Sequence, residues 1–363
     1  MIRISIFALA VVALQEKRPD PQALVRHAVR ELVKMEEPGG EWPYEGVYRV
    51  QGRIPVGYTV GGTALVAGTL LHAAAPEDRE ARVAIGRGLS VVLKGLEDPL
   101  MQPSADDVYD VRVWGHACAL EFLCQVRAAK AAGERAKDVE RWIPELVKTL
   151  AAEEIAGGGW NYASHRQHAA FVTAPVVQSL LWARAQGFEV PAELFVRARR
   201  ALESARAENG AFQYSGAMPE GSKPDTRDGA AGSCARSAGC EATLLLLGGG
   251  SSAALKSAID AFHAHWDELE KRRKKTGTHV GPHSIAPYYF YYGHRYAAQA
   301  IELLPAADRP RERARLLEVI MRTRDEDGCW NDRVFPRSRN YGTAMIALAL
   351  LGDRAPLPPA LPK

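Results

Sequence analysis

Two apolar patterns alternate along the chain. The first is a helical stripe: in residues 22–35, apolar side chains recur every three or four positions and charged side chains occupy the opposite face. This pattern is typical of a helix with one solvated side. It recurs along the chain and predicts outer helices at residues 22–35, 79–96, 137–155, 191–207, 252–274 and 308–324.

The second pattern is apolar on all sides. The run Gly342-Thr-Ala-Met-Ile-Ala-Leu-Ala-Leu-Leu351 is an example, and its small residues allow helices to approach closely. A helix without a polar face is expected to be buried all round. Such segments follow the amphipathic helices and predict inner helices at residues 60–75, 112–130, 173–186, 234–247, 285–304 and 340–351. Strand alternation is almost absent, so the predicted fold class is all-α.

The alternation of solvated and dry helices predicts two layers. Six inner helices around an axis, each backed by an outer helix, form an (α/α)6 toroid, or barrel, with one continuous core. Length alone, 363 residues, suggests two or three domains. The helix pairs instead place residues 20–352 in a single domain, with an open superhelix of helix pairs as the alternative. Residues 353–363 are rich in proline and are predicted to form a tail.

Four turns between outer and inner helices combine glycine with a following aromatic residue. They read Gly39-Gly-Glu-Trp42-Pro-Tyr, Gly157-Gly-Gly-Trp160-Asn-Tyr, Asn209-Gly-Ala-Phe212-Gln-Tyr and Asp327-Gly-Cys-Trp330-Asn-Asp. Glycine permits the turn, and the ring is expected to pack against the helix pair. These turns resemble the QW repeats of squalene cyclases and the related repeats of protein prenyltransferase β subunits. The resemblance covers nearly all of residues 20–352 and implies a terpenoid cyclase-like toroid with a central cavity for an isoprenoid or other apolar ligand.

The catalytic motifs of those families are incomplete in this chain. Class II terpene cyclases protonate an alkene with an aspartic acid of a D-x-D-D motif, which is absent here. Prenyltransferase β subunits hold zinc with an Asp-x-Cys pair and a downstream histidine. Asp327-Gly-Cys329 has the pair, but no histidine follows His294. We therefore predict neither a metal nor another cofactor, and five cysteines without a C-x-x-C motif do not indicate a disulfide framework.

The functional site is expected at the end of the barrel where the inner helices begin. Outer-to-inner connections, such as 156–172, have ten residues or more, whereas inner-to-outer connections, such as 187–190, are mostly short. Long loops on a rigid scaffold are the usual location of function, and converging helix N-termini favour anions.

Titratable and aromatic residues gather at this end. The predicted catalytic residues are Asp106, Asp107 and Asp110, as acids before the second inner helix, with His116 as their partner. Helix capping by the aspartates and a core role for His116 are the alternatives. Aromatic walls with a polar rim are typical of a small-molecule pocket. The predicted ligand-binding residues are Trp114, His165, His168, Arg236, Glu241, His283, Tyr288, Tyr289 and Tyr292.

Three functions are compatible with these features. The first is binding or transformation of an apolar ligand by a cyclase-like or prenyltransferase-like isomerase or transferase, with Asp107 or Asp110 as the acid and tyrosines stabilising positive charge. The second is a non-catalytic, exported binding or scaffold protein whose loop-rich end contacts a protein or glycan. The third is glycan cleavage by two opposed carboxylates, Asp107 with Asp228 or Glu241.

The N-terminus and the net charge bear on location and partners. Residues 4–14 are apolar, follow Arg3 and precede a polar segment, which is typical of a signal peptide spanning about residues 1–15. We therefore expect export to the periplasm or the cell exterior, with a cytoplasmic protein as the alternative. The run is too short for an ordinary membrane span. A net charge of +3 gives no indication of nucleic-acid binding.

Overall fold

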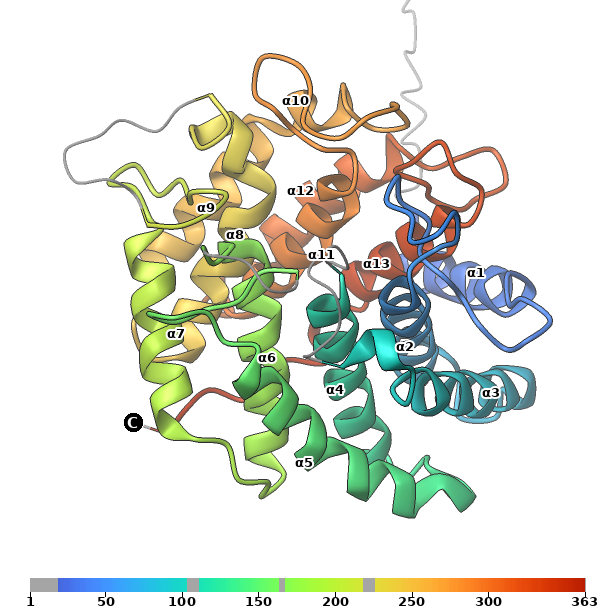
Figure 1. Cartoon of the computed structure of the whole chain (residues 1–363). Helices are drawn as coiled ribbons and strands as arrows, with labels where there is room; N and C mark the ends of the chain where they lie inside the picture. Colours follow the sequence, from blue (N-terminus) through green and yellow to red (C-terminus); the bar gives the residue numbers. More distant parts are fainter. Residues whose placement is uncertain (1–18, 103–110, 163–166, 218–225, 363) are drawn as a thin grey trace, which may run out of the picture.

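The fold consists of helix pairs arranged around one axis (Figure 1). The computed structural model describes residues 19–102, 111–162, 167–217 and 226–362. The outer helices are α1 (Pro21–Lys34), α3 (Arg79–Gly95), α5 (Ala136–Ala152), α7 (Ala192–Ser204), α9 (Ser252–Ala264) with the short α10 (Trp266–Glu270), and α12 (Arg309–Met321). The inner helices are α2 (Val56–Ala73), α4 (Arg112–Ala128), α6 (Ala170–Ala185), α8 (Ala230–Leu246), α11 (Tyr289–Glu302) and α13 (Ser338–Leu350).

The inner helices close into a ring. Each packs against the next, from α2 through α4, α6, α8 and α11 to α13, and α13 packs against α2. An open superhelix would leave the first and last inner helices apart, so the predicted toroid is confirmed. Within the described ranges, extended pairing is limited to isolated bridges, and three 3-10 turns complete the structure: η1 (Pro99–Met101), η2 (Gly133–Arg135) and η3 (Gly352–Arg354). None of the described helices is long and apolar enough to cross a membrane.

Local sequence explains both layers. Outer helices bury one stripe, as in α1, and three of them begin at capping side chains, Asp20, Asp78 and Ser251. Asp20 accepts from the backbone of Gln22 and Ala23, which satisfies donors that the first helical turn leaves free. Inner helices use small residues for close approach. A Cβ added at Gly57 would lie 2.7 Å from the Val111 carbonyl oxygen, so only glycine fits between α2 and the start of α4.

The main departure from the predicted elements lies in the fifth outer helix. The sequence predicts one helix over 252–274, but the chain leaves helical geometry at His265, and α10 then ends at Glu270. Trp266 is buried at this break, and its indole N–H donates to His294 Nε2 of α11 at 2.9 Å. Burial of this ring against the inner layer accounts for the interruption of the stripe.

The glycine-aromatic turns join the two layers in a repeated way. The indole of Trp42, Trp160 or Trp330 donates to a carbonyl of the preceding outer helix, ten residues earlier, at 2.7, 2.7 and 3.1 Å. The backbone N–H of the same tryptophan donates to a threonine hydroxyl of the following inner helix at 3.0, 2.9 and 3.2 Å. Each tryptophan therefore connects the two helices of its pair, as the resemblance predicts.

Candidate functional site

A cavity lies where the inner helices begin. Eight of its nine lining residues are aromatic; they come from the first turns of the inner helices and from the turns before them. The cavity measures about 50 Å³, which exceeds the space needed by one water. We call this the aromatic cavity, and its lining residues are Tyr44, Tyr58, Trp114, Tyr162, Phe171, Val172, Tyr288, Tyr292 and Tyr341.

The rings of the aromatic cavity hold one another in place. Tyr44 packs against Tyr341 and Tyr58, with ring centroids 4.6 and 5.2 Å apart, and Tyr58 meets Trp114 at 5.8 Å. Such tilted and edge-on arrangements are the ones that aromatic quadrupoles favour. The wall is therefore apolar and rigid, with ring faces that can stabilise a cation on a bound ligand.

Hydrogen bonds orient two of the wall tyrosines. The Tyr292 hydroxyl donates to the Phe171 carbonyl at 2.9 Å. The Tyr288 hydroxyl lies 3.2 Å from His279 Nε2, and His279 Nδ1 lies 2.9 Å from the Ser284 carbonyl oxygen. Because a carbonyl can only accept, Nδ1 carries a proton, and in the neutral ring Nε2 accepts from Tyr288. Burial lowers the pKa of His279, which favours this neutral form.

Asp332 is a buried acid close to this wall. It is fully buried, and its two carboxylate oxygens have no hydrogen-bond partner within the described part of the chain. Burial raises the pKa of Asp332 to about 7, against the opposing effect of the Arg333 charge. The Asp332 charge in turn adds to the raised pKa of Tyr44 and of Tyr341, so the carboxyl group acts electrostatically on the cavity wall.

Repeat geometry explains the position of Asp332. The residue two places after the aromatic plug is Tyr44, Tyr162 or Tyr214 in three of the glycine-aromatic turns, and Asp332 in the fourth. Tyr44 and Tyr162 line the aromatic cavity, and the ring of Tyr214 stacks on Phe171 at 5.2 Å. At this repeat position the last turn thus carries a carboxyl group where the others carry a phenol, and Asp332 lies behind the residues that line the cavity rather than among them.

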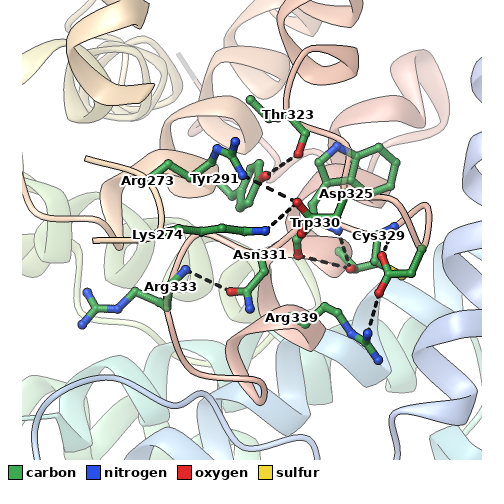
Figure 2. Close-up of polar contacts among 12 residues, drawn as sticks. Arg273, Lys274, Tyr291, Thr323, Asp325, Cys329, Trp330, Asn331, Arg333 and Arg339 are labelled. Atoms are coloured by element: carbon green, nitrogen blue, oxygen red, sulfur yellow. Dashed lines mark hydrogen bonds and ion pairs between the residues drawn. The ribbon is translucent and has the colours of Figure 1, made fainter. Parts of the chain in front are cut away.

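A network of charged side chains fixes the last turn (Figure 2). Lys274 Nζ binds Asp325 Oδ1 at 2.6 Å, and the Lys274 backbone N–H donates to the Asp332 carbonyl at 2.9 Å. Asp327 accepts from the Cys329 backbone N–H at 2.9 Å and pairs with Arg339. The Asp327-Gly-Cys329 pair is therefore occupied in building the turn. The described residues include no group of three or more His, Cys, Asp or Glu that could hold a metal.

The predicted site residues fall into separate places. Asp106, Asp107, Asp110 and His165 lie outside the described residues. Trp114, Tyr288 and Tyr292 line the aromatic cavity, and Tyr289 packs behind it on Phe171, with ring centroids 5.3 Å apart.

His116 belongs to a buried ion network. His116 Nδ1 lies 3.0 Å from Glu153 Oε2, and Arg112 Nε donates to Glu153 Oε1 at 3.0 Å. This network ties the start of α4 to the end of α5 and corresponds to the core role named as the alternative for His116.

Among the other predicted ligand-binding residues that the structure describes, Arg236, Glu241 and His283 lie near charged side chains, whereas Nε2 of His168 has no hydrogen-bond partner in the described ranges. Arg236 Nη2 lies 2.8 Å from Asp228, and Glu241 Oε1 lies 2.6 Å from Arg206 Nε. His168 is buried, and its backbone carbonyl accepts from Gly216. His283 Nε2 lies 3.9 Å from Glu268. None of these four lines the aromatic cavity as the described residues form it.

Sequence reasoning missed most of the cavity wall and its acid. The lining residues that were not among the predicted site residues are Tyr44, Tyr58, Tyr162, Phe171, Val172 and Tyr341, and Asp332 was not predicted either. The signal for Tyr44 and Asp332 was present in the spacing, because both stand two places after a tryptophan. Tyr58 and Tyr341 carried a weaker signal as aromatic residues in the first turn of an inner helix.

Comparison with known proteins identifies the fold. No protein family and no curated protein matches the sequence. Among solved structures, the type II terpene cyclase MstE from Scytonema, in complex with its substrate geranylgeranyl dihydroxybenzoate, matches with a TM-score of 0.53 at 14% identity over 92% of this chain and 97% of that one. An α-1,6-mannanase from Salegentibacter, bound to α-1,6-mannotriose, matches with a TM-score of 0.58 at 13% identity, over 91% of this chain and 98% of that one. The unsaturated glucuronyl hydrolase from a Bacillus species matches with a TM-score of 0.58 at 13% identity, over 90% of this chain and 94% of that one.

These similarities agree with the terpenoid cyclase-like toroid that the sequence predicts. The same all-α toroid serves terpene cyclization and glycan cleavage, so fold alone does not select a function.

Proposed function

We propose that the aromatic cavity binds the apolar part of an isoprenoid or similar ligand, and that Asp332 acts as the acid that initiates its isomerisation. The observation that carries the proposal is a cavity lined by eight aromatic side chains, with the buried carboxyl group of Asp332 close to it. That carboxyl group has no hydrogen-bond partner among the described residues. Apolar walls supply binding energy in proportion to the area they cover. A carboxylic acid with a pKa of about 7 remains partly protonated at neutral pH.

The chemical step balances as an isomerisation. Asp332 gives its proton to one alkene carbon, a new C–H bond forms with the π electrons, and the adjacent carbon becomes cationic. The ring faces of the cavity and the new carboxylate stabilise that charge. Loss of a proton from a neighbouring carbon then restores an alkene. The formula of the ligand is unchanged.

The ends of the inner helices suggest how the ligand is oriented. The first turns of α2, α4, α6 and α13 contribute to the cavity wall, and helix N-termini carry partial positive charge. A polar or anionic head group is therefore favoured at the loop-rich end, with the apolar chain directed into the cavity. The ligand we propose is amphipathic.

Glycan cleavage receives less support from the described carboxylates. The sequence names Asp107 with Asp228 or Glu241 as a catalytic pair, but Asp228 is bound to Arg236 and Glu241 to Arg206. A binding toroid without catalysis is the second candidate, favoured by the absence of a D-x-D-D motif.

The binding proposal is tested with farnesol and geranylgeraniol as probes. Trp114 lies in the cavity wall, so we expect ligand-dependent quenching of its fluorescence and a calorimetric binding signal. Trp114→Leu should weaken binding at least tenfold. Trp142→Leu is the matched control, because Trp142 lies on the outer helix α5, with its ring under Arg141. Equal affinity in both variants would contradict binding in the aromatic cavity.

The catalytic proposal is tested by comparing carboxylates. Product formation from geranylgeranyl substrates should fall at least a hundredfold in Asp332→Asn. Asp107→Asn and Asp110→Asn test the acids that the sequence predicts. If one of these variants abolished turnover while Asp332→Asn did not, that aspartate, and not Asp332, would be the catalytic acid. Binding without turnover in the wild-type protein would leave the binding toroid as the function.

We also propose that the protein is exported. The support is the apolar run at residues 4–14, preceded by Arg3 and followed by a possible small-residue cleavage site at Val11-Val12-Ala13. Mass spectrometry of the protein recovered outside the cytoplasm should show a chain that lacks about the first 13 residues. Recovery of the full-length chain in the cytoplasm alone would contradict export.

A further inference from the structure

The opposite end of the barrel is covered by the proline-rich tail. After η3, Pro356 lies among residues of α2, α4, α11 and α13, and Pro358 is buried. The Leu361 backbone N–H then donates to the Leu246 carbonyl at the end of α8, at 2.9 Å. Figure 1 shows the tail (red) running from the α13 side across the molecule to the C-terminal mark. The tail therefore crosses the ring where the inner helices end.

Beneath Pro356 lies a small space that we call the charged chamber. Residues of α2, α4 and α13 form most of its apolar lining, and Glu121, Gln125 and Arg295 supply its polar and charged groups. Arg295 Nη2 lies 3.0 Å from Glu121 Oε1, and Gln125 Nε2 donates to the same oxygen at 3.1 Å. The side chains of Arg295 and Glu121 are 12% and 17% exposed. The chamber measures about 20 Å³, enough for one water.

The charged chamber and the aromatic cavity lie along the same axis. Cys118 lines the chamber, and Trp114 lines the cavity one turn earlier on α4, which corresponds to a rise of about 6 Å. On α11, Tyr292 lines the cavity and Arg295 lies in the chamber. An opening at the tail would therefore bring solvent within one or two helical turns of the aromatic cavity.

The contacts of the tail suit a cover that can be displaced. Between 355 and 362, four residues are prolines, which lack a backbone donor and lose little conformational freedom on docking. In the described chain, the Leu361 N–H makes the single backbone hydrogen bond from this segment to a distant element. The tail covers Glu121 and Arg295, which regain hydration when they are exposed, and this gain opposes the loss of the apolar contacts that Ala355 and Leu361 make with the core.

We propose that residues 355–362 act as a displaceable stopper that closes the second end of the barrel over Glu121 and Arg295. Release of the stopper opens a second entrance toward the aromatic cavity. This property is independent of the ligand and of whether the protein is catalytic.

Cys118 provides a direct readout. It is half-buried in the chamber wall, whereas Cys124, Cys234, Cys240 and Cys329 are buried elsewhere. Burial raises the pKa of the Cys118 thiol to about 12, so it reacts slowly at neutral pH. Opening of the chamber hydrates the thiol and lowers its pKa toward the ordinary value, which accelerates its reaction with a water-soluble disulfide reagent.

The experiment compares the full chain with a chain that ends at Arg354. We expect reaction of one thiol to accelerate at least tenfold in the shortened chain, and Cys118→Ser to remove that signal in both backgrounds. An unchanged rate would overturn the proposal. Simultaneous acceleration of all five thiols would also overturn it, because the tail would then hold the whole fold together.

A milder variant keeps the test valid if the shortened chain does not fold. Pro356→Gly with Leu361→Asp retains the length of the tail but softens it and removes its apolar contact. We expect a two- to fivefold acceleration at Cys118 alone, with unchanged circular dichroism. No acceleration at Cys118 in this folded variant would overturn the proposal.

Discussion

Two turns of the barrel share one hydrogen-bonded framework around a tryptophan and carry different residues two places after it. In turns 157–162 and 327–332, the tryptophan indole donates to a carbonyl ten residues earlier, and the tryptophan backbone N–H donates to a threonine 13 residues later. Two places after the tryptophan stands Tyr162 in the first turn and Asp332 in the second. The shared contacts build the scaffold, while the differing residue sets the chemistry presented to the axis.

The largest expected effect concerns the shared framework. Trp330→Ala should lower the free energy of unfolding by about 3–5 kcal/mol, because it removes a fully buried ring and leaves a cavity. Trp330→Phe should lower the free energy of unfolding by less, since a phenylalanine, Phe212, occupies the corresponding buried position in the turn at 209–214. Urea denaturation of both variants measures the difference. Equal losses would mean that the indole hydrogen bond, rather than the ring, provides the stability.

The second-largest effect is the pH dependence of stability that Asp332 causes. The pKa of Asp332 is about 7 in the folded chain, above the ordinary value of 3.8. Below pH 3.8 the side chain is protonated in both states; as pH rises toward 7, the unfolded chain releases the proton first, and the folded state loses stability. The loss can reach about 4 kcal/mol.

Asp332→Asn tests this pH dependence directly. The neutral amide removes the titration, so the variant should lose less stability than the wild-type chain between pH 4 and pH 8. Asp325→Asn is the matched control, because Asp325 pairs with Lys274 and Arg273 in the same loop. Parallel stability profiles for wild type and Asp332→Asn would show that Asp332 does not titrate as the buried acid described here.

The helices and the turns between them show which parts of the fold could be predicted from the sequence. Apolar patterning predicted the twelve helices of the two layers, and the glycine-aromatic turns predicted how the four pairs that contain them are joined, because both signals are local and repeated. The break at His265 was missed, since it depends on Trp266 finding His294, a residue on another helix. Local periodicity carries no information about such a partner.

The candidate site was harder to predict because it is assembled from distant segments. The sequence predicted Trp114, Tyr288 and Tyr292 as ligand-binding residues at this end of the barrel, and all three line the aromatic cavity. Arg236 and Glu241 were expected at the pocket as charged residues of the fourth inner helix, and each is paired with a residue that the sequence pattern does not reveal. Asp332 has a signal in the spacing of the turns, but its complete burial and its effect on Tyr44 and Tyr341 depend on contacts between distant segments, which the sequence does not show.

A smaller effect tests whether the two frameworks are equivalent. Thr173→Val and Thr343→Val each remove the hydroxyl that accepts from a buried tryptophan N–H, and valine fills nearly the same volume. An unpaired buried donor costs about 1–3 kcal/mol, so similar losses are expected in both turns. Chemical denaturation of the two variants side by side gives the comparison. A loss of stability in only one of the two variants would mean that the threonine hydrogen bond contributes to stability in one turn and not in the other.

The smallest effect is expected at the tyrosine that corresponds to Asp332. Tyr162→Phe keeps the ring in the wall and removes only its hydroxyl, which interacts with Tyr288, so the cost should be about 0.5–1.5 kcal/mol. The phenol is buried and its pKa is raised well above 10, hence it stays neutral and the loss should not vary between pH 4 and pH 8. The same measurements used for Asp332→Asn provide the contrast. If Tyr162→Phe changed the pH profile as strongly as Asp332→Asn, the pH effect would belong to the packing of this position and not to the acid.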